Sequence, residues 1–149
     1  MQKLLEEAGY EVVLQYANND IPTQLNQVED MVEDCDVIVI AAIEGSSLGQ
    51  ALEAAKANGI PVIAYDRLLM DNGNVDYYAT FDNFKVGVVQ GTFVEEALDL
   101  ANAEGPFAFE FTAGDPGDNN AGFFFNGAMS VLKPYIEAGK ITVKSGQTE

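Results

Sequence analysis

The sequence has no histidine, no tryptophan and a single cysteine. Zinc sites in proteins usually combine cysteine and histidine ligands, so a zinc site of the usual kind is excluded. The lone thiol, Cys35, has no partner for a disulfide within the chain and no histidine to activate it as a nucleophile. It lies among acidic residues just before an apolar run, which favours half-buried packing for this side chain.

Positive charge is also scarce, because 7 basic residues stand against 24 acidic ones and the formal net charge is −17. Nucleic-acid binding needs clustered lysine and arginine, so this balance argues against a nucleic-acid partner. It argues equally against docking on an anionic membrane surface. The acidity either keeps a soluble protein soluble or serves an extracytoplasmic surface that carries charge for a partner.

Several further features are missing. No apolar run is long enough to span a bilayer, and the first residues do not form a signal peptide. They are typical of the end of an amphipathic helix that stops at Gly9, so we expect a truncated N-terminus. The patterns GxGxxG and GxxxxGK[ST] do not occur, so neither a nucleotide nor any other cofactor is expected.

Short apolar runs typical of strands alternate with longer runs of helical periodicity. The run 36–42 is continuously apolar after its first residue, as in a parallel sheet that is covered on both faces. The expected strands are 11–16, 36–42, 60–65, 77–81, 107–112 and 141–144. The expected helices are 22–33, a segment capped by Ser46 or Ser47, 83–101 with Val86, Val89, Phe93, Ala97 and Leu100 on one face, and one marked by Phe125, Ala128, Met129, Leu132 and Ile136 that Pro134 bends or interrupts.

This alternation predicts an α/β fold with a mainly parallel sheet. Ligands of such sheets bind at the carboxyl ends of the strands. Three loops directly follow an expected strand: 43–47, 66–74 and 113–120. They are the candidate site loops.

Asp66 and Arg67 come directly after the expected strand 60–65. A carboxylate supplies acceptors and a guanidinium supplies a planar fork of donors, so together they can satisfy neighbouring sugar hydroxyls. A surface ion pair at a strand end is the alternative interpretation of the dipeptide alone.

The third loop gathers acids and amides: Asp115, Asp118, Asn119 and Asn120. These side chains are good hydroxyl partners, but Asp118 or Asn119 can equally cap the helix that follows. Nothing in the sequence pairs the carboxylates for acid–base catalysis or for a metal ion. Three consecutive phenylalanines, 123–125, suggest either stacking on a ligand or, with more support from the helical period, core packing.

Two long motifs resemble one family. They are IPVIAYDR (60–67), continued by VDYYATFDN (75–83), and GDPGDNNA (114–121), continued by residues 127–129 and 132–135. The motifs resemble the type I periplasmic sugar-binding proteins of ABC transporters, and among them the branch of D-xylose-binding and multiple-monosaccharide-binding proteins. The resemblance covers essentially the whole chain.

The resemblance implies two three-layer α/β/α lobes with mainly parallel sheets, both incomplete here. Residues 1–82 would be a first lobe that lacks its first strand, and 83–149 the first part of the second lobe. It implies that Asp66 and Arg67 contact sugar hydroxyls from the first lobe, and that Asp118 and Asn120, with Asn119, do so from the second. Because half a site makes fewer hydrogen bonds, we expect this chain alone to bind sugar poorly or not at all.

The implied function is non-enzymatic capture of a monosaccharide, such as xylose, glucose or galactose, for an ABC importer. The implied partners are the sugar, the ABC permease and a chemoreceptor, with a monomer as the full-length form. The implied location is the periplasm, or the cell exterior as a lipoprotein. Two alternatives stay open: the effector-binding domain of a LacI-type transcription regulator, which needs a helix-turn-helix upstream, and a sugar-handling α/β enzyme, which needs a catalytic pair.

Overall fold

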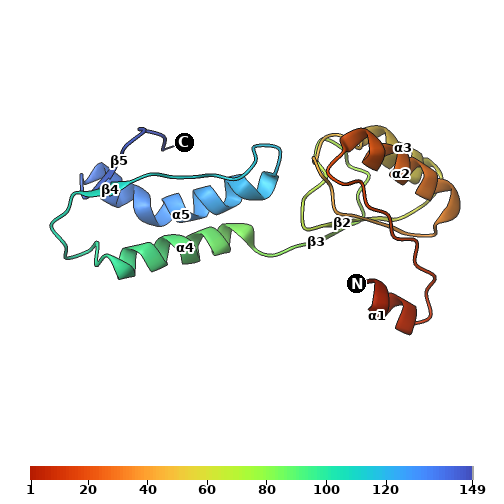
Figure 1. Cartoon of the computed structure of the whole chain (residues 1–149), viewed down its shortest axis with the longest axis horizontal. Helices are drawn as coiled ribbons and strands as arrows, with labels where there is room; N and C mark the ends of the chain where they lie inside the picture. Colours follow the sequence, from red (N-terminus) through yellow and green to blue (C-terminus); the bar gives the residue numbers. More distant parts are fainter. Residues whose placement is uncertain (149) are drawn as a thin grey trace. The chain divides into compact units, whose positions relative to one another are not determined.

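The computed structural model describes residues 1–148 (Figure 1). The chain divides into two compact units. The first unit comprises Met1–Ala64 and Leu69–Tyr77, and the second comprises Tyr65–Leu68 and the described residues from Tyr78 onward. The helices and strands in chain order are α1 (Gln2–Glu7), α2 (Ile21–Asp34), β1 (Ile38–Ile40), α3 (Gly49–Ala57), β2 (Val62–Tyr65), β3 (Tyr77–Ala79), α4 (Asn83–Ala97), β4 (Phe107–Phe109), α5 (Asn119–Glu137) and β5 (Ile141–Val143).

The first unit is built on a parallel pair of strands, with Ile38 of β1 opposite Val62 of β2. The strand order of its sheet is β1-β2-β3. One face of the pair is buried and consists of Ile38, Ile40, Val62 and Ala64, whereas Val39 on the other face of β1 is 39% exposed. The prediction of a sheet covered on both faces is therefore wrong for the described residues. Helices α2 and α3 add their apolar faces to one core, whose buried members are Val28, Val32, Ile38, Ile40, Ala42, Leu48, Ala51, Leu52, Ala55, Val62, Ala64 and Leu69.

The second unit pairs β4 with β5 in parallel, Phe107 opposite Ile141, and α5 is the crossover between them. Helices α4 and α5 lie side by side with their N-termini at the same end (Figure 1). Its buried core is small and consists of Leu100, Leu132 and Ile141, surrounded by half-buried aromatic and aliphatic side chains. Phe125 is half-buried and packs edge-on against Phe111, which borders this core, with ring centroids 5.7 Å apart, whereas Phe123 is exposed.

Glycines bring α4 and α5 unusually close. A Cβ at Gly87 would overlap the carbonyl oxygen of Phe124, and a Cβ at Gly127 would overlap that of Phe84. The expected apolar face of α4 is consequently not the packing face. Val86, Val89 and Phe93 are exposed, and Phe93 is 71% exposed. That prediction was wrong, because the contact is made by residues that lack a side chain.

Two smaller predictions were also wrong, and one alternative of a third is excluded. Residues 11–16 form no strand, because the described residues offer this segment no partner strand. The serines do not cap α3, whose N-cap is Leu48; the hydroxyl groups of Ser46 and Ser47 instead donate to Glu44. Pro134 does not interrupt α5, since the helix continues to Glu137; the alternative, that it bends the last turn, stays a prediction.

Other boundaries are close to the expected ones. The first helix ends at Ala8 and Gly9, and Gly9 adopts a φ of 93°, which glycine tolerates without strain. Asp20 caps α2 by accepting from the Thr23 backbone N–H at 2.9 Å, with Pro22 in the first turn. Among the described helices, none has the length and apolar character needed to cross a membrane.

Candidate functional site

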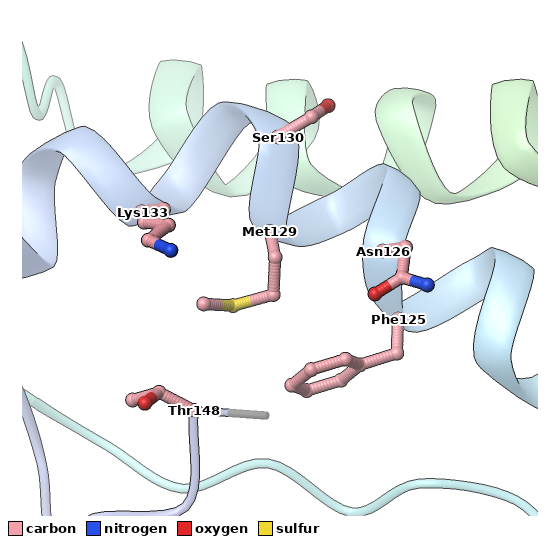
Figure 2. A pocket seen from close by; sticks show the side chains of 6 residues that line it. All are labelled: Phe125, Asn126, Met129, Ser130, Lys133 and Thr148. Atoms are coloured by element: carbon pink, nitrogen blue, oxygen red, sulfur yellow. The ribbon is translucent and has the colours of Figure 1, made fainter.

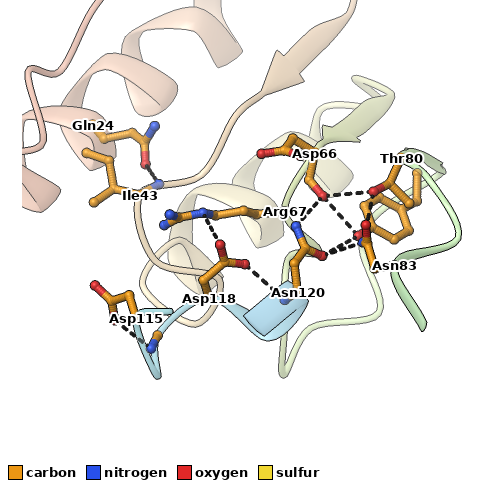
Figure 3. A network of polar contacts seen from close by, with 11 residues as sticks. Gln24, Ile43, Asp66, Arg67, Thr80, Asn83, Asp115, Asp118 and Asn120 are labelled. Carbon is orange, nitrogen blue, oxygen red and sulfur yellow. Dashed lines mark hydrogen bonds and ion pairs between the residues drawn. The ribbon is translucent and has the colours of Figure 1, made fainter. Parts of the chain in front are cut away.

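The backbone of Asp66 is the centre of a polar network in the second unit (Figure 3). β2 ends one residue earlier, and Asp66 turns the chain with a φ of 66°, a left-handed conformation that aspartate adopts more readily than most residues. Its N–H donates to the Ala79 carbonyl oxygen at 2.9 Å. Its own carbonyl oxygen accepts from the Tyr78 hydroxyl at 3.0 Å and from the Thr80 hydroxyl at 3.1 Å.

Asn120 supplies a third donor to the same carbonyl, through its Nδ2 at 3.1 Å. The Oδ1 of Asn120 accepts from Asn83 Nδ2 at 2.7 Å. Asn83 and Asn120 are 8% and 3% exposed, so their mutual hydrogen bond is shielded from water. Buried polar groups cost free energy when they lack partners, so this hydrogen bond offsets the cost of burying the two amides.

Arg67 and Asp118 form an ion pair, with 3.2 Å between Arg67 Nε and Asp118 Oδ2 (Figure 3). Asp118 is also the N-cap of α5, where its Oδ1 accepts from the Asn120 backbone N–H at 2.9 Å. The two side chains are 30% and 20% exposed, so they are partly desolvated and remain accessible from solvent. The helix cap, one of the two alternatives that the sequence left open for Asp118, is therefore confirmed; its role as a partner of ligand hydroxyls stays a prediction.

The other acids and amides of the third loop lie apart from these hydrogen bonds. Asp115 Oδ1 accepts from the Gly117 backbone N–H at 2.8 Å, which shapes the loop before α5. Asn119 is the first residue of α5 and is half-buried, but its side chain takes no part in the network described above. The structure thus brings together Asp66, Arg67, Asp118 and Asn120 of the five predicted site residues.

This arrangement presents donors and acceptors side by side. The guanidinium offers N–H groups, and the carboxylates of Asp66 and Asp118 offer oxygens, which is the complement of a hydroxylated ligand. No group of acidic or cysteine side chains within residues 1–148 is placed to hold a metal ion. The geometry of Arg67, Asp66 and Asp118 suits hydrogen bonding to a polar ligand.

Two hollows lie near α5. One of about 270 Å³ has Asp118 on its wall together with Gly114, Ala121, Phe124 and other residues of the second unit. The other, of about 370 Å³, is lined by Phe125, Asn126, Met129, Ser130, Lys133 and Thr148 (Figure 2). The larger hollow contains no predicted site residue and is no part of the network around Asp66.

Cys35 lies outside this network, at the C-terminal cap of α2, and packs half-buried against the first core. Burial, followed by the negative charges of Asp34 and Asp36, raises the pKa of its thiol. A raised pKa lowers the fraction of reactive thiolate. The predicted half-buried packing of Cys35 is confirmed by its contact with the first core.

Sequence reasoning missed Tyr78, Thr80 and Asn83 as members of the network. One signal was available, since residues two apart on a strand point to the same face, and Tyr78 and Thr80 both reach the Asp66 carbonyl. Asn83 gave no such signal, because a polar residue at a helix start is usually read as part of a cap.

The comparisons with known proteins agree with one another. The whole chain, residues 1–149, matches the family described as the periplasmic binding protein domain. The multiple sugar-binding periplasmic receptor ChvE of Rhizobium radiobacter is 59% identical over 146 residues, which are 97% of this chain and 41% of the relative. The D-xylose-binding periplasmic protein of Escherichia coli is 39% identical over 146 residues, which are 97% of this chain and 42% of that protein.

Solved structures give the same picture. An ABC transporter solute binding protein from Clostridium phytofermentans with bound β-D-glucose superposes with a TM-score of 0.96 at 56% identity, covering 99% of this chain and 46% of that one. A carbohydrate transporter solute binding protein from Chloroflexus aurantiacus, in complex with D-glucose, superposes with a TM-score of 0.86 at 34% identity, covering 96% of this chain and 41% of that one. This chain therefore spans less than half the length of the relatives it matches.

The resemblance inferred from the two motifs is confirmed, and so is the α/β fold class with parallel strands. The match extends over the full chain and reaches 59% identity with a curated relative. The chain belongs to the periplasmic binding protein family and has its type I fold.

Proposed function

We propose that the protein containing this chain is an extracytoplasmic solute-binding protein that captures a monosaccharide and delivers it to an ABC importer. The observation that carries the proposal is the Arg67–Asp118 ion pair, which lies next to the Asp66 peptide whose carbonyl oxygen accepts from Asn120. It occurs in a chain 59% identical to a multiple sugar-binding periplasmic receptor and 56% identical to a solute binding protein with bound β-D-glucose.

The proposed contacts follow from the chemistry of each group. Arg67 donates to sugar oxygens, while the carboxylates of Asp66 and Asp118 accept from sugar hydroxyls. Asn120 Nδ2 carries two hydrogens, one of which is committed to the Asp66 carbonyl, so the other can donate to the ligand. Asn119 is a weaker candidate at the edge of the same site.

The working cycle is binding and release without a chemical step. The boundary between two lobes is proposed near residue 82, and closure of the lobes around the sugar would exclude water from these hydrogen bonds. The relatives carry sugar-binding rather than enzymatic names, which supports a protein that does no catalysis.

Partners and location follow from the proposed function. The sugar-loaded protein would dock on the ABC permease of the importer and could also signal to a chemoreceptor. It would act as a monomer in the periplasm, or outside the membrane as a lipoprotein. A net charge of −17 on this chain is compatible with such a surface and unsuited to nucleic acid.

The experiment is isothermal titration of the complete protein with D-xylose, D-glucose, D-galactose and L-arabinose. Asp66→Asn keeps a residue that tolerates positive φ and keeps the backbone carbonyl, but it removes the charge. We expect it to weaken binding by roughly tenfold or more. Asp71→Asn is the matched control, because Asp71 lies in the same loop with a φ of 57° and should leave the affinity unchanged.

A wild-type protein that binds none of these sugars would overturn the proposal. Equal losses in the two variants would remove Asp66 from the site. The chain of 149 residues, titrated alone, should bind poorly or not at all; micromolar affinity would contradict the expectation that part of the site lies in other segments.

A further inference from the structure

The described part of the chain holds two buried polar side chains, Asn83 and Asn120. Asn120 belongs to the proposed binding site, whereas Asn83 has no role so far. Asn83 is the first residue of α4, but it is not the cap, because Asp82 accepts from the Lys85 backbone N–H at 2.9 Å. A buried amide that does not cap its helix needs another explanation.

The direction of every hydrogen bond in the network follows from one backbone carbonyl. The Asp66 oxygen can only accept, so Asn120 must present its Nδ2 to it, and Oδ1 is then turned toward Asn83. Asn83 must in turn present its Nδ2, which donates to Asn120 Oδ1 at 2.7 Å and to Thr80 Oγ1 at 3.3 Å. Thr80, having accepted, donates its own proton to the Asp66 oxygen at 3.1 Å.

These bonds form a closed ring in which Asn83 supplies two donors (Figure 3). With an acceptor in its place, Asn120 would be free to turn its amide over. Its Oδ1 would then face the Asp66 oxygen, and two acceptors without a proton between them repel each other. Asn83, together with the Tyr78 hydroxyl group 3.4 Å from Oδ1, therefore reinforces the orientation of Asn120 that the Asp66 carbonyl selects.

The helix pair explains why Asn83 can reach this position. Gly87 and Gly127 let α4 and α5 approach until their backbones touch, and the two N-termini lie at the same end. Asn83 and Asn120 are both in the first turns of these helices, so the close approach places their amides in contact. The glycine contact thus sets the distance between α4 and α5, and the hydrogen bond between Asn83 and Asn120 relates the orientations of their two amides.

We propose that Asn83 is a positioning residue of the ligand site: it reinforces the amide orientation in which Asn120 donates to the Asp66 carbonyl, and so helps to hold the peptide next to the Asp66 and Arg67 side chains. The inference rests on the proposed function, because its consequence is measured as sugar affinity. Its structural half, the orientation of Asn120, can be measured without any sugar.

The main variant is Asn83→Asp, which preserves shape but replaces the donor with an acceptor at neutral pH. In nitrogen–proton NMR spectra of the chain, we expect the side-chain amide resonances of Asn120 to shift and to exchange faster with solvent. In the complete protein, we expect the affinity for the best-bound monosaccharide to fall roughly tenfold or more. The unfolding midpoint should fall as well, because the new carboxylate is buried and has lost the two hydrogen bonds that Asn83 donates.

A second pair of variants tests the ring without touching a buried residue. Thr80→Val removes the hydroxyl group with little change of shape and should weaken binding, whereas Thr80→Ser keeps the hydroxyl group and should restore it. If Thr80 had only a structural role, Thr80→Val and Thr80→Ser would bind the sugar with equal affinity whenever their stabilities are equal. This pair also decides the matter if Asn83→Asp does not fold.

The outcomes separate the two proposals. If the wild-type protein binds no sugar, the proposed function fails, and the Asn120 resonances alone decide the role of Asn83. If the wild-type protein binds sugar and Asn83→Asp and Thr80→Val bind it equally well, the positioning role is overturned and the proposed function stands. Unchanged Asn120 resonances in Asn83→Asp also overturn the positioning role.

Discussion

The two units of this chain are held together by different means. The first has a core of aliphatic side chains from two strands and two helices, such as Leu52, which is 1% exposed. Within the described residues, the second has three buried hydrophobic residues in its core cluster, and its helices α4 and α5 are in contact through glycines. The comparison teaches that the first unit depends on a filled aliphatic core, whereas the second depends on close backbone contact between two helices and also contains the polar network.

The largest expected effect comes from emptying the first core. Leu52→Ala removes a side chain that is 1% exposed and should lower the free energy of unfolding by about 2–5 kcal/mol. Leu4→Ala is the matched control, since Leu4 is also helical but 70% exposed, and it should have almost no effect. Chemical denaturation measures both, and equal losses would contradict the assignment of Leu52 to the core.

The next largest effect comes from filling the glycine contact of the second unit. Gly127→Ala places a methyl group on the Phe84 carbonyl and should lower the free energy of unfolding by about 3 kcal/mol, at the upper end for overpacking. Gly122→Ala, in the same helix but with open space around it, should be neutral or raise stability by about 1 kcal/mol. Hydrogen exchange should show reduced amide protection in α4 and α5. Unchanged protection there would contradict the claim that the glycine contact stabilises the second unit.

The smallest effect concerns a helix cap in the first unit. Hydrogen bonds from Thr23 lower the pKa of Asp20 below its ordinary value of 3.8. A carboxyl group with a depressed folded-state pKa stabilises the protein above the unfolded-state pKa, and this contribution is lost as pH falls through the folded-state pKa. Asp20→Ala should therefore lower the unfolding midpoint by a few degrees at pH 7, and the difference should shrink below pH 3.8.

Asp30→Ala serves as the control for that cap. It removes one negative charge from an exposed position of the same helix but no cap. A midpoint drop as large as that of Asp20→Ala would mean that charge, rather than capping, accounts for the effect.

The predictive power of the sequence also differs between the units. The strands β1 and β2 were predicted, because continuous aliphatic runs act locally. The packing face of α4 was not, because hydrophobic periodicity counts side chains and cannot detect a contact made by Gly87 and Gly127. The exposed Phe93 shows how far such a count can mislead.

The candidate site was predicted in part for a related reason. Asp66, Arg67, Asp118 and Asn120 follow strands or begin a helix, so position along the chain points to them. Asn83 acts through Asn120, and Asn120 through a carbonyl 54 residues away in sequence. Such chained, long-range hydrogen bonds leave no periodic trace, so only the structure revealed the residues that hold the site.

The most direct test of the central claim is a crystal structure of the complete protein with D-glucose. The account predicts the sugar within hydrogen-bond distance of the Arg67 guanidinium and of the Asp66 and Asp118 carboxylates, with Asn120 still donating to the Asp66 carbonyl. A sugar bound without contact to Asp66, Arg67 or Asp118 would contradict the account.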